Sequence, residues 1–274
     1  MNVLYCGDQN IEKGLKLSVL SLCRQVTEPL HIYVMTLSFC QNDTVIYPVR
    51  TEAVMACEQW LKEHNPDSTI QLISMEKEFE AALPVANLAT RFTPCCMLRL
   101  YADLVRELPD RILYLDNDVL ARKDCTSFYE QDMEGKELAG VLDYYGSWFF
   151  RKHIWKRDYI NSGVLLLNLK EIRRTGLFEK CRKLCAEKKM FFPDQTALNQ
   201  LTSKKVLAPR QYNEQRKCKE DTVFQHFTTS FRLFPWFHTV HVKPWQTERV
   251  HEILHLHEYD ALFAQYQQLE YRES

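Results

Sequence analysis

Short apolar runs alternate along the first part of the chain with stripes of apolar residues at helical spacing. The runs, which are typical of buried strands, cover residues 3–6, 30–35 and 70–73. Leu15, Val19, Leu22 and Val26 fall on one face of an intervening helix, and a second helix is indicated over about residues 50–64. Strands that alternate with helices in this way predict an α/β fold with a mostly parallel sheet.

The same alternation continues toward the C-terminus. Residues 94–107 have the pattern of a helix that leads into an apolar strand at 111–115. Further strands are predicted at 138–142, 164–167 and 222–228, and further helices at 170–188, 194–202 and 247–270. We therefore expect a central sheet flanked by helices, followed by a helical C-terminal stretch.

Two aspartates, Asp116 and Asp118, come directly after the 111–115 run and form the one Asp-x-Asp pattern of the chain. In extended backbone, residues two apart point the same way, which puts these side chains about 6.6 Å apart at ~3.3 Å per residue. Open α/β sheets bind their ligands at the carboxyl ends of strands. Paired acidic residues are usually only solvated, but two hard oxygen donors at a strand end suit Mg²⁺ or Mn²⁺ carrying a phosphorylated substrate.

Composition and charge narrow the classes of function. The 274 residues are 46% hydrophobic and 26% charged, with a net charge of −1, so nothing suggests a nucleic-acid partner. The sequence has no apolar stretch of the ~20 residues that span a bilayer, and its N-terminus lacks the basic and apolar regions of a signal peptide. Ten cysteines without an export signal favour free thiols in a reducing compartment. We expect a cytoplasmic protein with at most peripheral membrane contact.

The positions of the glycines indicate how a nucleotide would be bound. The chain has seven, all scattered, and it contains neither G-x-G-x-x-G nor G-x-x-x-x-G-K-[ST]. A nucleotide diphosphate would therefore be held by a metal ion and side chains rather than by a glycine-rich loop.

An ordered set of short motifs spreads over most of the chain. The motifs are Val-Leu-Tyr-Cys-Gly-Asp-Gln-Asn at 3–10, Arg-Leu-Tyr-Ala at 99–102, Leu-Tyr-Leu-Asp-Asn-Asp-Val at 113–119, Tyr-Ile-Asn-Ser-Gly-Val-Leu-Leu-Leu-Asn at 159–168, Pro-Asp-Gln at 193–195 and Lys-Pro-Trp at 243–245. Together they resemble glycosyltransferase family 8, the group that contains glycogenin and the lipopolysaccharide galactosyltransferases.

The resemblance implies a Rossmann-like glycosyltransferase fold of the A type and a UDP-sugar donor. It also implies Mn²⁺, with Mg²⁺ as the alternative, and transfer of glucose or galactose with retention of configuration to a saccharide or glycolipid hydroxyl. On this basis residues 1–245 form the glycosyltransferase domain, with a nucleotide-binding part at about 1–120 and a sugar and acceptor part at about 121–245. Residues 246–274 are expected to form a helical extension.

The metal ligands implied by the resemblance are Asp116, Asp118 and a histidine. The family has a His-aromatic pair followed by glycine and then Lys-Pro-Trp, whereas this chain has no glycine after Gly176. His226, which precedes Phe227, matches the pair best, and His238 is the alternative at a more usual spacing. The missing glycine removes an expected backbone donor to the diphosphate, which leaves Lys243 as the phosphate contact.

The resemblance also assigns residues to the donor and to the reacting centre. Asp8 and Asn10 are expected to contact the base and ribose, although such side chains also favour turns. Arg99 is expected to reach the donor, the alternative being a surface arginine. The donor-binding set is completed by Cys6, Asn117, Ser162 and Lys243. The catalytic set is Asp143, Asn161, Asp194 and Gln195, in which Gln195 lies close to the anomeric carbon and the carboxylates accept hydrogen bonds from sugar hydroxyls.

Other classes of function have weaker support in the sequence. His251-Glu252-x-x-His255 matches the H-E-x-x-H pattern of zinc peptidases, but its continuation fails, so a solvated helix face is the simpler interpretation. A nucleotidyltransferase usually has a glycine-rich loop after its first strand. A non-catalytic UDP-sugar-binding protein remains an alternative.

Overall fold

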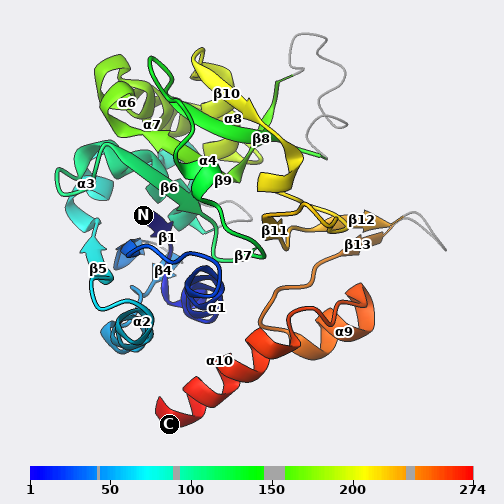
Figure 1. Ribbon diagram of the computed structural model, residues 1–274. Helices are drawn as coiled ribbons and strands as arrows, with labels where there is room; N and C mark the ends of the chain where they lie inside the picture. The colour runs from blue at the N-terminus through cyan, green and yellow to red at the C-terminus, as the bar shows by residue number, and fades with distance from the viewer. Residues whose placement is uncertain (42–43, 89–92, 145–157, 233–237, 274) are drawn as a thin grey trace.

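The computed structural model describes residues 1–41, 44–88, 93–144, 158–232 and 238–273, and it consists of a central sheet between two layers of helices (Figure 1). The sheet has seven strands in the order β10-β8-β9-β6-β1-β2-β5. Its strands are β1 (Asn2–Cys6), β2 (His31–Thr36), β5 (Thr69–Ser74), β6 (Arg111–Leu115), β8 (Leu138–Leu142), β9 (Ile160–Asn168) and β10 (Lys205–Ala208). The predicted α/β class with a mostly parallel sheet is confirmed.

Within the described residues, helices and three two-stranded ribbons accompany this sheet. The α-helices are α1 (Glu12–Cys23), α2 (Thr51–His64), α3 (Glu76–Ala81), α4 (Thr126–Tyr129), α6 (Leu169–Thr175), α7 (Leu177–Glu187), α8 (Pro193–Leu201), α9 (Thr247–Leu254) and α10 (Asp260–Glu273). The 3₁₀ segments are η1 (Gln9–Ile11), η2 (Val85–Asn87), η3 (Pro94–Leu104) and η4 (Arg210–Tyr212). The ribbons pair β3 (Phe39–Gln41) with β4 (Thr44–Ile46), β7 (Val119–Ala121) with β11 (Phe224–His226), and β12 (Ser230–Arg232) with β13 (His238–Val240).

The side-chain alternation of the strands builds one apolar core on each face of the sheet. In β6, Ile112 and Tyr114 join the core that contains η3, α7 and α8. Leu113 and Leu115 join the opposite core, which is completed by α1 and α2. A strand buried on both faces needs a continuous apolar run, and this explains why 111–115 is legible in the sequence.

Strand β9 runs against its neighbours, an exception to the parallel pattern. It is antiparallel to both β6 and β8, while the remaining neighbouring strands of the sheet are parallel. This reversal puts the beginning of β9, with Asn161 to Gly163, beside the carboxyl end of β6. The backbone N–H of Asp116 donates to the carbonyl of Gly163 at 2.8 Å.

Three predicted helices differ from the structure in detail. The segment predicted at 94–107 is a 3₁₀ helix, η3. The segment at 170–188 is two helices, because Gly176 adopts a left-handed conformation with φ of 67°. The C-terminal stretch is also two helices, α9 and α10, and His255 ends α9 with φ of 55°.

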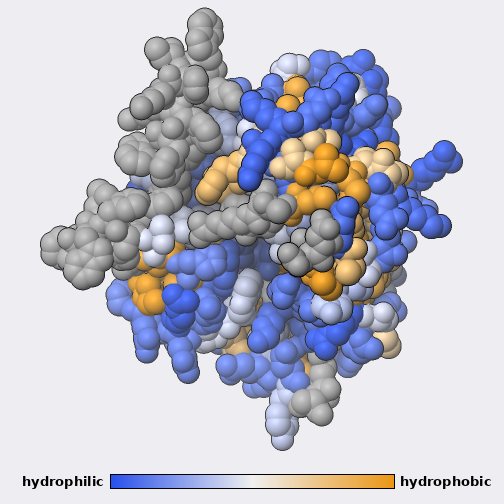
Figure 2. All heavy atoms as spheres, turned by 180° about the vertical axis from the view of Figure 1, so that it is seen from behind, coloured by the Kyte–Doolittle hydropathy of each residue, from blue (hydrophilic) through white to orange (hydrophobic). Residues whose placement is uncertain are grey.

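The C-terminal helices pack on the domain through an apolar cluster. Val250, Tyr259, Leu262 and Phe263 are buried there together with residues of α1 and β7. Figure 2 shows that hydrophilic side chains dominate the face opposite to the view of Figure 1, with apolar side chains gathered mainly in its upper part. Among the described residues, a helix with the length and apolarity needed to cross a bilayer is absent.

Candidate active site

The Asp116–Asp118 segment is a tight turn rather than extended chain. Asp116 follows the last residue of β6, and the N–H of Val119 donates to the carbonyl of Asp116 at 3.1 Å. The prediction that strand periodicity aligns the two carboxylates was therefore wrong in its geometry. The turn links β6 to the short strand β7, and it brings the carboxylates of Asp116 and Asp118 toward the same histidine.

His226 meets both carboxylates from the facing strand. β11 pairs with β7 in antiparallel register, with His226 opposite Val119. The Nε2 atom of His226 lies 3.2 Å from Asp118 Oδ1 and 3.7 Å from Asp116 Oδ2. The ligand atoms of the three residues all lie within 4.8 Å of one another, and Asp118 and His226 are buried.

Gly163 leaves the space in which these side chains meet. A Cβ atom at this position would lie 2.2 Å from His226 Cε1 and 2.8 Å from Asp116 Oδ2. Contacts this short do not occur between non-bonded atoms, so a larger residue would displace the histidine or the aspartate. Glycine at this position thus lets β9 approach the two ligands closely.

Arg99 is a buried arginine that connects two acidic residues of the site. Its guanidinium lies 2.8 Å from Asp116 Oδ1 and 3.4 Å from Asp194 Oδ2, and its side chain is 6% exposed. The guanidinium also lies over the ring of Tyr114 at 4.1 Å. Burial alone would lower the pKa of Arg99, but Asp116, Tyr114 and Asp194 raise it well above its ordinary value. The alternative of a surface arginine is therefore wrong.

The four residues expected at the reacting centre form one hydrogen-bonded network. Asp143 Oδ2 accepts from Asn161 Nδ2 and from Gln195 Nε2, each at 3.0 Å. The other end of the Gln195 amide accepts from the Ser162 N–H at 3.0 Å, and Ser162 Oγ donates to Asp194 Oδ2 at 3.1 Å. Because both ends of the Gln195 amide are engaged, its orientation is fixed.

Burial disfavours ionisation of the Asp194 carboxyl group. Its pKa is raised, chiefly because the carboxyl is buried and secondarily because Asp116 is near, while Arg99 opposes the shift. Asp194 lies in the first turn of α8, two residues after the N-cap residue Phe192. The helix terminus therefore holds Asp194 and Gln195 together at the edge of the network.

Lys243 brings a cation to the turn. Its Nζ contacts Asp118 Oδ2 and donates to the carbonyl of Phe227 at 3.2 Å. Burial would raise the pKa of Asp118, but Lys243 and His226 lower it below its ordinary value. Asp118 is consequently an ionised carboxylate despite being buried.

The remaining predicted donor residues lie around the first strand and its loop. Asp8 is buried, and its side chain accepts from the backbone N–H of Asn10 at 2.9 Å, which is the turn role named as its alternative. Burial raises the pKa of the Cys6 thiol.

Asn117, the middle residue of the Asp116–Asp118 turn, lies against α1. A Cβ on Gly14 of this helix would be 2.4 Å from the carbonyl oxygen of Asn117. The same position would be 2.7 Å from a ring carbon of Trp245, so Gly14 lets the Asp116–Asp118 turn and Lys-Pro-Trp approach the helix.

The sequence interpretation missed Asn213 and Tyr114. Asn213 Oδ1 lies 3.1 Å from His226 Nδ1, and its Nδ2 donates to Asn161 Oδ1 at 3.0 Å. The Tyr114 hydroxyl donates to Asp116 Oδ1 at 2.6 Å. Tyr114 belongs to the 113–119 motif and was visible there, whereas Asn213 lies in no motif and is identified only by its contacts.

The sequence left two other roles for histidines open: His238 as the third metal ligand, and the H-E-x-x-H pattern as a zinc peptidase site. His238 begins β13, and its side chain lies outside the described part of the chain. His255 lies just beyond the end of α9 in a left-handed conformation. Among the described residues, the metal-competent group that includes His251 contains His257 and Asp260, and neither Glu252 nor His255. The zinc peptidase interpretation therefore has no geometric support.

Comparison with known proteins identifies the family. The model of glycosyl transferase family 8 matches residues 2–249. The chain belongs to this family. The resemblance inferred from the motifs is thus confirmed, and so is membership in a class of glycosyltransferases.

Individual relatives of this family 8 chain match it at moderate identity. The glycosyltransferase GlyF of Streptococcus pneumoniae is 28% identical over 138 residues, which cover 48% of this chain and 31% of that protein. The lipopolysaccharide 1,2-glucosyltransferase of Escherichia coli is 27% identical over 197 residues, or 62% of this chain and 56% of that protein. The matches thus span less than two thirds of these curated relatives.

A solved structure supports the fold of the family 8 chain. The galactosyltransferase LgtC, in complex with donor and acceptor sugar analogues, matches with a TM-score of 0.66 and 19% identity over 97% of this chain and 96% of that chain. At this identity the match bears on the fold alone, which is the predicted glycosyltransferase fold of the A type.

Proposed function

We propose that this protein is a retaining, metal-dependent hexosyltransferase that moves glucose or galactose from a UDP-sugar to a saccharide or glycolipid hydroxyl. The observation that carries the proposal is the group of Asp116, Asp118 and His226, whose ligand atoms lie within 4.8 Å of one another at the carboxyl end of β6. Open α/β sheets bind ligands at this edge. The family 8 relatives named above include a lipopolysaccharide glucosyltransferase.

The donor atoms of this group fit a divalent cation such as Mn²⁺, with Mg²⁺ as the alternative. Two carboxylates and one imidazole nitrogen combine hard oxygen donors with a borderline nitrogen donor. Gly163 preserves the space between them, and Asp118 is kept ionised by Lys243 and His226. When bound, the cation would neutralise charge on the leaving diphosphate as a Lewis acid.

Lys243 and Arg99 are the proposed cationic contacts to the donor. Lys243 has its ammonium at Asp118, beside the proposed metal position, where it would add a point charge to the diphosphate. Arg99 is held by Asp116 and Asp194 and would present a fixed guanidinium edge. Positive charge that is fixed before the reaction stabilises the leaving group without reorganisation.

The network around Asp143 is the proposed sugar site, with Asp194 and Asn161 as partners of sugar hydroxyls. Both ends of the Gln195 amide are hydrogen-bonded and the amide is a poor nucleophile, while Asp194 is restrained by Arg99 and Ser162. Retention through a covalent intermediate needs an available carboxylate. We therefore favour front-face attack, in which the acceptor hydroxyl approaches on the side that UDP leaves and passes its proton to the leaving phosphate.

The test is release of UDP from UDP-glucose and UDP-galactose with Mn²⁺, measured across a panel of saccharide acceptors. We expect Asp118→Ala and His226→Ala to lower turnover by at least about 100-fold, the scale of losing a main electrostatic group. Asp132→Ala, at an exposed aspartate, is the matched control and should retain activity. NMR of the product gives the anomeric configuration, and inversion would contradict retention.

Two outcomes would redirect the proposal. UDP-sugar binding without turnover over the whole acceptor panel would favour a non-catalytic UDP-sugar-binding protein. A sugar trapped on Asp143 or Asp194 would replace front-face attack with a covalent route.

A further inference from the structure

We infer that His251, His257 and Asp260 form a second metal site, separate from the proposed catalytic one, that takes a Zn²⁺-class transition-metal ion. The three residues come from the end of α9, the connecting segment and the start of α10. They form one of the two groups of metal-competent side chains found among the described residues. Two of them lie in or near the H-E-x-x-H pattern that a peptidase interpretation failed to explain.

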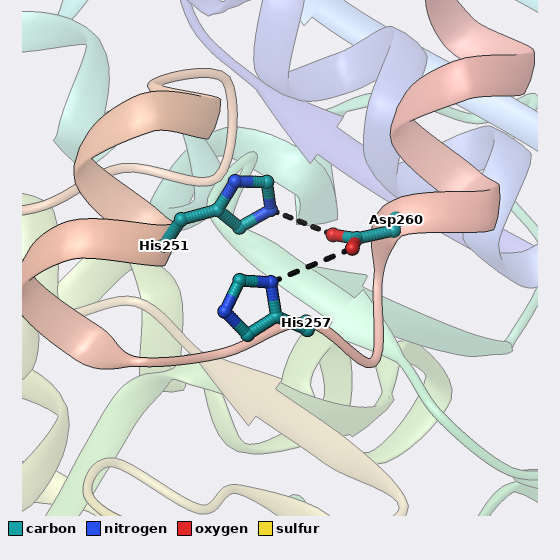
Figure 3. Close-up of side chains that lie close together, drawn as sticks. All are labelled: His251, His257 and Asp260. Carbon is teal, nitrogen blue, oxygen red and sulfur yellow. Dashed lines mark hydrogen bonds and ion pairs between the residues drawn. The ribbon is translucent and has the colours of Figure 1, made fainter.

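The side chains already converge on one another (Figure 3). His251 Nε2 lies 2.6 Å from Asp260 Oδ1, and His257 Nδ1 lies 3.5 Å from Asp260 Oδ2. The two imidazole rings are stacked, with centroids 4.6 Å apart and planes 22° apart. All three ligand atoms lie within 4.8 Å of one another. Ligand atoms about 2.0–2.1 Å from a tetrahedral metal are about 3.4 Å apart, so a small rotation of side chains completes the geometry.

The backbone that carries these ligands is anchored by buried neighbours. Val250 precedes His251 and Tyr259 precedes Asp260, with exposures of 0% and 4%. The N–H of Asp260 donates to the carbonyl of His257 at 3.2 Å, which holds the connecting turn. The ring of His251 also packs near Phe263, at a centroid distance of 6.4 Å. The ligands are thus fixed at their base and exposed at their tips, so a metal ion meets a preformed site open to solvent.

The donor set selects the class of ion. Two imidazole nitrogens and one carboxylate oxygen favour Zn²⁺, Ni²⁺ or Cu²⁺ over Mg²⁺ and Ca²⁺, which prefer oxygen ligands. The neighbouring Glu258 is engaged elsewhere, in an ion pair with Arg122. Three protein ligands leave room for water on the solvent side. Binding would fasten the end of α9 to the start of α10.

The test is a titration of the chelator-treated full chain with Zn²⁺ alone, with Co²⁺ as the spectroscopic probe. It is made in a His226→Ala background, which removes the proposed catalytic site from the measurement. We expect one Zn²⁺ equivalent to bind, and His257→Gln to weaken this binding by at least about tenfold. His255→Asn is the matched control in the same turn, because asparagine tolerates its left-handed conformation, and it should leave binding within about twofold.

Nitrogen NMR of the histidines gives a readout independent of affinity. Zn²⁺ should shift Nε2 of His251 and Nδ1 of His257, the atoms that face Asp260, and leave His255 unchanged. If His226→Ala does not fold, the comparison is made in the otherwise unchanged chain, where His257→Gln should remove one of the bound equivalents. Equal loss in His255→Asn and His257→Gln, or no saturable binding, would overturn the site. Neither result depends on transferase activity, so the proposed function stands or falls separately.

Discussion

The orientation of His226 is set by a chain of amides that begins at Asp143. The backbone N–H of Gly163 donates to Asn161 Oδ1 at 3.0 Å, so Nδ2 is the end of the Asn161 amide that faces Asp143. Asn161 Oδ1 then accepts from Asn213 Nδ2, which leaves Asn213 Oδ1 to accept from His226 Nδ1. His226 therefore carries its proton on Nδ1 when neutral and presents the lone pair of Nε2 to Asp116 and Asp118.

Replacing Asn213 should loosen the proposed metal site without touching a ligand. Asn213 is fully buried, and Asn213→Leu keeps its size while removing the partner of His226 Nδ1. We expect Mn²⁺ affinity, measured by electron paramagnetic resonance, to fall about 10–100-fold, as for other partners of metal-bound histidines. Asn213→Asp still accepts from His226 but no longer donates to Asn161 Oδ1, so it should recover part of the affinity. Equal loss in both variants would contradict a role for the contact with His226 Nδ1.

Gly163→Ala should be more damaging than its single added methyl suggests. The new Cβ would lie 2.2 Å from His226 Cε1 and 2.8 Å from its Nδ1, the atom that Asn213 holds. We expect Mn²⁺ binding to be lost while the circular dichroism spectrum remains that of a folded protein. Gly140→Ala is the comparison, because its closest contact is a leucine methyl at 3.0 Å, away from the three ligands. Normal Mn²⁺ affinity in Gly163→Ala would contradict the placement of His226.

At the scale of elements, the sequence predicted the features that depend on local pattern, such as the positions of the buried strands. The apolar runs of β1, β2 and β6 were legible because these strands are buried on both faces. The reversal of β9 was not, because strand direction depends on pairing between residues far apart in the chain. The motifs identified most of the site because each is a short continuous stretch of sequence. Asn213 was missed because its role depends on contacts with Asn161 and His226, which lie far from it in the sequence.

The first turns of α1 and α2 are joined by Glu12 and Arg50, and this link should respond to pH. Glu12 accepts from the N–H of Arg50 at 2.9 Å and pairs with its guanidinium. Burial would raise the pKa of Glu12, but the hydrogen bonds from Arg50 lower it below the ordinary value. A carboxyl with a lowered pKa stabilises the fold above the unfolded pKa of about 4.3, and this contribution is lost as pH falls through the folded pKa.

Glu12→Gln should therefore reduce the free energy of unfolding at pH 7 and converge with the original chain in acid. Arg50 is 67% exposed, so screening limits the loss to about 0.5–1 kcal/mol. Urea unfolding at pH 7 and below about pH 4 measures the difference. Glu58→Gln, in the exposed pair with Lys62, is the control and should change stability by less than about 0.5 kcal/mol. A pH-independent difference would mean that Glu12 acts through packing.

At the scale of the whole molecule, the C-terminal helices are part of the folded unit rather than an appendage. Phe263 of α10 is 3% exposed and lies in the cluster that also contains Leu17 and Leu20 of α1. Phe263→Ala should lower the free energy of unfolding by about 3–5 kcal/mol, because it removes a buried ring and leaves a cavity. Tyr271→Ala, at an 84% exposed ring of the same helix, should stay within about 0.5 kcal/mol. Equilibrium urea unfolding distinguishes the two, since a packed extension loses stability in one cooperative transition. A separate early transition in the unaltered chain, with Phe263→Ala affecting only that step, would show that α10 unfolds independently of the sheet.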